Sequence, residues 1–167
     1  MLPAETMSRP SSAPLSFPLP VVLDTNVVLD MLVFDDPVTR PLAEALDQGA
    51  LTAWANAETL LELERVLTLS IFELDGDTQR TVYSRYQSLV RLASEATPAS
   101  LPALPRCRDR DDQKFLVLTA HAGAAWLVSK DKRVLSLADR HGLPFAILSP
   151  KQAVEAMRLA RGPSAPS

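Results

Sequence analysis

The chain has 167 residues, of which 47% are hydrophobic and 22% charged; this composition suits one globular domain and excludes a collagen-like or wholly disordered chain. No apolar run approaches the roughly 20 residues of a membrane-spanning helix, so we expect no membrane partner. The formal charge of −3 excludes a chain that is basic throughout, so nucleic-acid contact would need a local basic patch or metal ions. The single cysteine, Cys107, excludes an intramolecular disulfide and a cysteine zinc site and predicts a cytoplasmic protein.

Proline and serine mark the two ends of the chain. Five of the 14 prolines lie in the first 20 residues, and two more lie in the last five. Segments of this composition bury too little apolar surface to become ordered. We therefore predict disordered tails over 1–19 and 159–167, and a single domain over 20–158.

Short apolar runs alternate with amphipathic stretches along the predicted domain. The runs suit parallel strands buried on both faces, and the stretches have apolar residues at helical spacing. In chain order, the first half predicts a strand at 21–23, a helix at 27–32, a helix ended by Gly49, a strand at 51–55, a helix from Asn56 to Leu67, and a long helix from Gly76 to Ala93.

The second half continues the alternation after a proline-rich crossing segment. It predicts a helix that starts at Asp109 or Asp111 and ends near Gly123, a strand at 124–128, a helix at 132–141, a strand at 145–148, and a final helix after Pro150. Strands alternating with helices in this way indicate an α/β fold with a parallel sheet. In such sheets, chemistry gathers at the carboxyl ends of the strands.

Acidic residues occupy several of these ends. Asp24 closes the first strand, and Asp131 follows the strand at 124–128. The helix that feeds the same edge opens with three more aspartates, Asp109, Asp111 and Asp112. Carboxylates brought this close raise one another's pKa, and a hard divalent cation such as Mg²⁺ or Mn²⁺ is the usual remedy. Such ions can activate water against a phosphodiester.

Glu62 is a further candidate on the helix after the second strand. It stands between Leu61 and Leu63 in a stretch that otherwise packs, and a carboxylate at the rim of a packing face is costly without a partner. Glu64 is better explained as a solvated surface acid. Glu58 lies in the first turn, where an acid complements the helix dipole.

Four segments of the chain resemble the PIN-domain family, in that family's order and at about its spacing: VVLDTNVVLDMLVF (21–34), ETLLELERVL (58–67), CRDRDDQKFLVLTA (107–120) and LVSKDKRVL (127–135). The resemblance covers residues 20–154 and is greatest to a bacterial subgroup of toxin components of toxin–antitoxin pairs. It implies a three-layer α/β/α sandwich around a mostly parallel sheet of four to five strands. It also implies ribonuclease activity dependent on Mg²⁺ or Mn²⁺.

Carried over position by position, the resemblance implies that four acids hold the metal and act in catalysis: Asp24, Glu62, Asp112 and Asp131. Supporting roles are expected for Thr25, Asn26, Asp109 and Ser129. One of the aspartates at 109, 111 and 112 is expected to serve only as a helix cap, and the role of Asp30 stays open. Arg110 departs from the family, which has proline there. Basic residues flank the acids and form either a solvated rim or a guide for phosphates: Arg106, Arg108, Arg110, Lys114, Lys130, Lys132 and Arg133.

The leading hypothesis is therefore a metal-dependent ribonuclease, the toxin of a pair, with RNA as substrate, a cognate antitoxin protein as partner and a homodimer as a further expectation. One alternative is a catalytically inactive PIN-like module that binds RNA or protein. Another is a phosphotransfer or phosphatase domain. Against the latter, Asn26 stands where a haloacid-dehalogenase-type phosphatase needs a second aspartate, and apolar residues precede Asp24 where a receiver domain needs an acidic pair.

Overall fold

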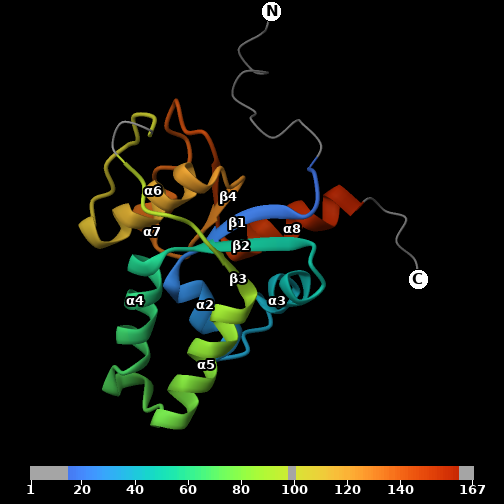
Figure 1. Ribbon diagram of the computed structural model, residues 1–167. Helices are drawn as coiled ribbons and strands as arrows, with labels where there is room; N and C mark the ends of the chain where they lie inside the picture. Colours follow the sequence, from blue (N-terminus) through green and yellow to red (C-terminus); the bar gives the residue numbers. More distant parts are fainter. Residues whose placement is uncertain (1–14, 98–100, 162–167) are drawn as a thin grey trace, which may run out of the picture.

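The computed structural model describes residues 15–97 and 101–161. Its five strands form a single parallel sheet in the order β3-β2-β1-β4-β5. The strands are β1 (Leu19–Leu23), β2 (Leu51–Ala55), β3 (Val90–Leu92), β4 (Trp126–Val128) and β5 (Ala146–Leu148). Helices cover both faces of this sheet (Figure 1). The predicted three-layer α/β/α architecture is thus confirmed, with five strands and every pairing parallel.

The helices divide between the two faces and one protruding arm. On one face lie α2 (Thr25–Leu32), α3 (Arg40–Asp47) and α8 (Pro150–Arg161), and on the other lie α6 (Gln113–Ala122) and α7 (Lys132–Leu135). The arm consists of α4 (Ala57–Leu67) and α5 (Gly76–Leu89), which extend from the sheet beside α2 (Figure 1). Single 3₁₀ turns occur at η2 (Ser70–Phe72) and η4 (Arg110–Asp112). No helix in the described ranges is long and apolar enough to cross a membrane.

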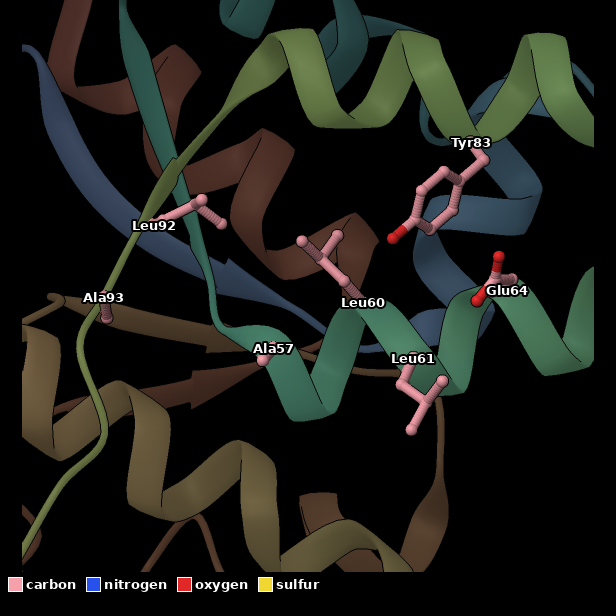
Figure 2. Close-up of a pocket in the computed structure, with 7 residues that line it drawn as sticks. All are labelled: Ala57, Leu60, Leu61, Glu64, Tyr83, Leu92 and Ala93. Carbon is pink, nitrogen blue, oxygen red and sulfur yellow. The ribbon is translucent and has the colours of Figure 1, made fainter.

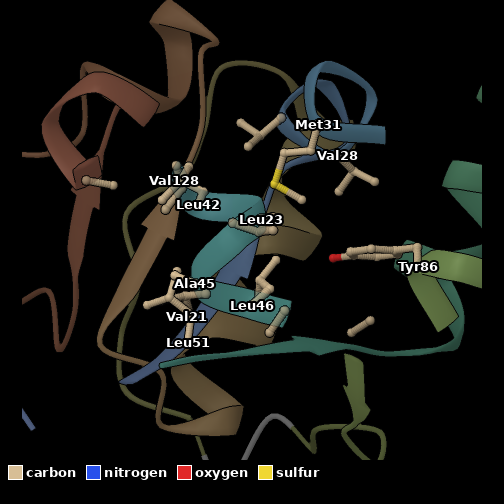
Figure 3. Packing of buried hydrophobic residues seen from close by; sticks show 14 of the residues in the cluster. Val21, Leu23, Val28, Met31, Leu42, Ala45, Leu46, Leu51, Tyr86 and Val128 are labelled. Carbon is tan, nitrogen blue, oxygen red and sulfur yellow. The ribbon is translucent and has the colours of Figure 1, made fainter. Parts of the chain in front are cut away.

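Two apolar cores lie on opposite sides of the sheet, and β1 contributes to both. Val21 and Leu23 pack with α2, α3 and α8, whereas Val22 packs with α6 and α7 on the other face. Figure 3 shows the first of these cores, into which the ring of Tyr86 points from α5. Burial of each such side chain contributes about 1.5–3 kcal/mol. Burial on both faces explains why β1 and β4 have no polar positions.

The long helix predicted from Gly76 to Ala93 is wrong at its C-terminal end. The helix α5 ends at Leu89, and Val90–Leu92 forms β3, the edge strand beside β2. Val90 and Ala93 do fall at helical spacing from Tyr86, so the pattern alone favoured a continued helix. Pairing with Ala53–Ala55 satisfies the outer backbone groups of β2, and this tertiary contact outweighs local propensity.

The helix predicted at 132–141 is also wrong in length, because α7 spans only Lys132–Leu135. Beyond it the chain continues in turns, with Leu137 and Arg140 bonding back three residues to Val134 and Leu137. The spacing of three places both Val134 and Leu137 in the buried core. At the C-terminus, α8 extends to Arg161, into the segment predicted as a tail. The tail predictions for 1–14 and 162–167 lie outside the described residues.

Candidate metal centre

Asp24 stands at the junction of β1 and α2. Leu23 pairs with Val128 in the register between β1 and β4, so the next residues of the two strands, Asp24 and Ser129, lie side by side. The Ser129 hydroxyl donates to Asp24 Oδ2 at 2.6 Å. Asp24 is also the N-cap of α2, where its carbonyl accepts from the amide of Val27 at 2.9 Å. Asp24 is therefore held by a strand end and a helix start together.

The surroundings of Asp24 disfavour its charged form. Its side chain is buried, and this burial is the main cause that raises its pKa. The nearby charges of Glu62 and Asp131 raise that pKa further, while the hydrogen bonds from Ser129 and from the Thr25 backbone partly offset the effect. A cation placed here would favour the ionised carboxylate.

A tight acidic group forms where η4 meets the start of α7. One carboxylate oxygen from each of Asp109, Asp112 and Asp131 lies within 4.8 Å of the others. Asp109 caps η4 by accepting from the Asp111 amide at 3.0 Å. Asp131 caps α7 by accepting from the Arg133 amide at 2.8 Å. The two capping carboxylates, from two separate short helical turns, thus lie close together.

Asp112 is the most perturbed member of this group. It is 9% exposed, and its Oδ2 is buried with no hydrogen-bond partner in the described part of the chain. Burial raises its pKa to about 7, helped by the neighbouring carboxyl of Asp131 and by the charges of Asp24 and Asp109. Three converging carboxylates, one with an unused buried oxygen, are a donor set that fits a hard divalent cation such as Mg²⁺ or Mn²⁺.

Glu62 has the partners that its position in a packing stretch required. Its Oε2 accepts from the Thr25 hydroxyl at 2.5 Å, and its Oε1 lies 2.5 Å from Lys114 Nζ. The side chain of Glu62 is 15% exposed. Its charge contributes to the raised pKa of Asp24, so α4 does direct this acid toward the end of β1.

The chain places the predicted site residues at one edge of the sheet, though not equally. Asp112 and Asp131 belong to the tight group, and Asp109 joins them although it was expected only in support. Asp24 is electrostatically coupled to that group, whereas both oxygens of Glu62 are already bonded.

Among the expected supporting residues, Thr25 contacts Glu62 and Ser129 contacts Asp24, while Asn26 is exposed. The capping role falls to Asp109, and Asp111 is exposed.

The sequence profile of the PIN domain family matches residues 20–133, which include all of these acids. The chain belongs to the PIN domain family. PIN domains are typically metal-dependent nucleases that use divalent ions, and the cluster of Asp109, Asp112 and Asp131 agrees with that chemistry.

In fold, this PIN domain is similar to the crystal structure of PAE2754 from Pyrobaculum aerophilum, with a TM-score of 0.53. The two share 15% sequence identity over 86% of this chain and 90% of the other. At that identity the likeness concerns the fold alone. No curated protein sequence matches this chain.

Three contacts of the PIN domain were not predicted from the sequence. Lys114, expected on the basic rim, is buried against Glu62. Asp30 is buried on α2, where its Oδ2 lies 2.6 Å from Lys130 Nζ. Tyr86, which looks like one apolar position of a helix, is buried near enough to Asp24 for that charge to raise its pKa, after burial as the main cause. Only the second contact had a signal in the sequence. Asp30 stands inside the apolar run VVLDML, and a buried acid needs a cation.

An apolar groove of the PIN domain lies apart from the acids. It has a volume of about 400 Å³ and runs between α4, α5 and β3 (Figure 2). Its lining is mostly apolar: Ala57, Leu60, Leu61, Glu64, Tyr83, Leu92 and Ala93. Glu64 is its one acid, and none of the metal-centre acids lines it. The groove is therefore separate from the acidic group.

Proposed function

We propose that this PIN domain is a Mg²⁺- or Mn²⁺-dependent endoribonuclease and the toxin of a toxin–antitoxin pair, acting in the cytoplasm. The observation that carries the proposal is the buried, unbonded Oδ2 of Asp112 within a group of three converging carboxylates. Such a group is costly in a folded protein unless a cation offsets it. Family membership supports a nuclease.

Five acids would form the site. Asp109, Asp112 and Asp131 would hold the ion, with Asp24 and Glu62 beside them. When bound, the ion offsets the negative charge and supplies Lewis-acid activation of water and of the phosphodiester. Two hydroxyls orient the acids in advance, since Ser129 donates to Asp24 and Thr25 donates to Glu62.

Exposed basic residues beside the acids support a phosphate-bearing substrate. Arg133 links the two kinds of charge, because its Nη1 lies 3.3 Å from Asp109 Oδ2 and its Nε lies 3.9 Å from Asp131 Oδ1. Cations placed around a metal centre attract a polyanion and guide its backbone. Other exposed bases in the same segments are Arg106, Arg108, Arg110, Lys130 and Lys132.

A cleavage assay tests the proposed chemistry. Labelled single-stranded RNA and a DNA of the same sequence are incubated with the protein in EDTA, Mg²⁺ or Mn²⁺. We expect metal-dependent internal cleavage of RNA only, and a loss of more than about 100-fold in Asp112→Asn. Cleavage of both polymers would contradict an RNA-specific enzyme. RNA binding without cleavage in any metal would favour the inactive binding module.

Two further measurements address the toxin role and the assembly. Induced expression in a bacterial host is expected to arrest growth, and Asp112→Asn is expected to abolish the arrest. Normal growth with the wild-type chain would remove the toxin and its antitoxin from the proposal while leaving the nuclease. Light scattering should give twice the 18.2 kDa chain mass for the proposed homodimer, and a monomer would remove it.

A further inference from the structure

The side chain of Lys114 lies inside the acidic site. This residue is in the first turn of α6, two positions after Asp112, and its Nζ lies 2.5 Å from Glu62 Oε1. The same ammonium donates to the Asp111 carbonyl at 2.7 Å and lies 5.6 Å from the centroid of the Phe115 ring. Only 10% of the side chain is exposed. An ammonium with a carboxylate, a carbonyl and an aromatic face around it has a defined place.

Lys114 sets Glu62 apart from the other acids. Since Thr25 takes the second oxygen of Glu62, both oxygens of this carboxylate are engaged. In the described part of the chain, Asp109 and Asp131 are paired with Arg133, whose side chain is 55% exposed. Water screens an exposed charge far more than a buried one. The least screened of these positive charges is therefore the Lys114 ammonium, and it contacts Glu62.

We propose that Lys114 is an internal cation that competes with the divalent ion, a positioning residue that releases Glu62 only when the ion displaces it. The inference rests on the proposed function, because it needs the metal centre. The Lys114 ammonium, 2.5 Å from Glu62 Oε1, offsets the negative charge that this oxygen would otherwise offer to an ion. An ammonium and a divalent ion in one poorly screened site also repel each other. Lys114 thus lowers the affinity of the site for the metal while stabilising the metal-free protein.

Mn²⁺ titration calorimetry on the full chain tests this role. Lys114→Met is expected to lower the Kd for Mn²⁺ by about tenfold or more, because the competing charge is gone. Lys114→Arg keeps the charge and should stay near the wild-type Kd. Lys132→Met is the matched control, since it removes the same charge from an exposed position next to Asp131, and it should change the Kd by less than about threefold.

Thermal unfolding separates competition from a merely structural role. Without metal, Lys114→Met should melt at a lower temperature than the wild type, because Glu62 loses its partner. With saturating Mn²⁺ it should gain more stability than the wild type gains. If Lys114 only supported the fold, Lys114→Met would also lower the melting temperature. It would then weaken Mn²⁺ binding, whereas competition predicts stronger binding.

A second background guards against a misfolded variant. In Glu62→Gln a neutral amide replaces the carboxylate. The double variant, Glu62→Gln with Lys114→Met, therefore leaves no unpaired charge at these two positions. The double variant should bind Mn²⁺ more tightly than Glu62→Gln alone. Equal or weaker binding on removal of Lys114 in both backgrounds overturns the inference and leaves the metal centre intact. If neither the wild type nor any variant binds Mn²⁺, the metal centre and the inference are overturned together.

Discussion

The Ser129 hydroxyl donates to Asp24 Oδ2 at 2.6 Å, although 105 positions separate the two residues in the chain. The same hydroxyl oxygen accepts from the backbone amide of Asp131 at 3.0 Å. A single buried side chain therefore connects the acid at the end of β1 with the acid at the start of α7. This link sets the spacing of two acids of the proposed metal centre.

We expect Ser129→Ala to lower the free energy of unfolding by about 1–3 kcal/mol, because a buried oxygen of Asp24 loses its donor. The pKa of Asp24 should rise further, since the lost hydrogen bond is one that lowers it, and Mn²⁺ should bind more weakly. Urea unfolding and metal titration at pH 7.5 measure both effects. The control is Ser136→Ala, which removes an exposed hydroxyl bonded to the Arg133 carbonyl and should cost under about 0.5 kcal/mol. Equal costs for the two variants would contradict the linking role.

Asp112→Asn should stabilise the metal-free protein at pH 8, by about 1–2 kcal/mol. The pKa of Asp112 is raised from 3.8 to about 7, so the folded chain keeps a proton there that the unfolded chain releases. Its contribution to stability therefore falls as the pH rises from about 4 to about 7, and the full cost is present above pH 7. The asparagine cannot ionise and carries no such cost.

Urea unfolding in EDTA between pH 4.5 and 8 checks this prediction. The wild type should lose stability relative to Asp112→Asn across that window. Asp111→Asn is the matched control, since this neighbouring carboxyl is exposed, and it should follow the wild-type curve. Parallel curves for the wild type and Asp112→Asn would assign the pH dependence to another group.

Mn²⁺ affinity should increase between pH 6 and pH 8 in the wild type. Asp112 has to lose its proton before it binds a cation, and its pKa of about 7 places that loss within this range. Well below the pKa, affinity should change by about tenfold per pH unit. Calorimetry in two buffers with different heats of ionisation should detect nearly one proton released at pH 6 and almost none at pH 8. Proton release that is equal at both values would contradict the assignment.

Lys130→Met should cost about 1–3 kcal/mol of unfolding free energy, because it leaves the buried Asp30 without its cation. The pair Arg85–Asp47, at 3.2 Å, is about half exposed on both sides, so Arg85→Met is expected to cost under about 0.5 kcal/mol. Denaturant unfolding of both variants measures the difference. Adding Asp30→Asn to Lys130→Met should recover part of the loss. A cost for Lys130→Met no larger than for Arg85→Met would show that burial of Asp30 does not matter.

Local sequence patterns were sufficient to predict the central strands of the PIN domain and the helices between them. β1 and β2 are short apolar runs that parallel strands buried on both faces require, and the helices between them have a regular apolar face. Asp24 and Asp131 follow strands, and parallel topology brings such ends to one edge. These positions follow from the order of residues alone, since each depends on neighbours within a few residues.

Other elements depended on contacts between distant residues. Val90–Leu92 continues the helical spacing of α5, and only the vacant edge of β2 makes it a strand. Asp109, Asp111 and Asp112 are equivalent by residue type. The turn at η4 decides which one caps, which one is buried and which one faces solvent.

The sequence by itself determined that acids would meet at the edge of a parallel sheet, because strands that alternate with helices run parallel and bring their carboxyl ends to one edge. Only the tertiary structure decided how those acids are paired. Lys114 reaches Glu62 from another helix, and Lys130 reaches Asp30 from the end of β4. Charge–charge energies depend on distance and burial, and neither quantity exists until the chain has folded.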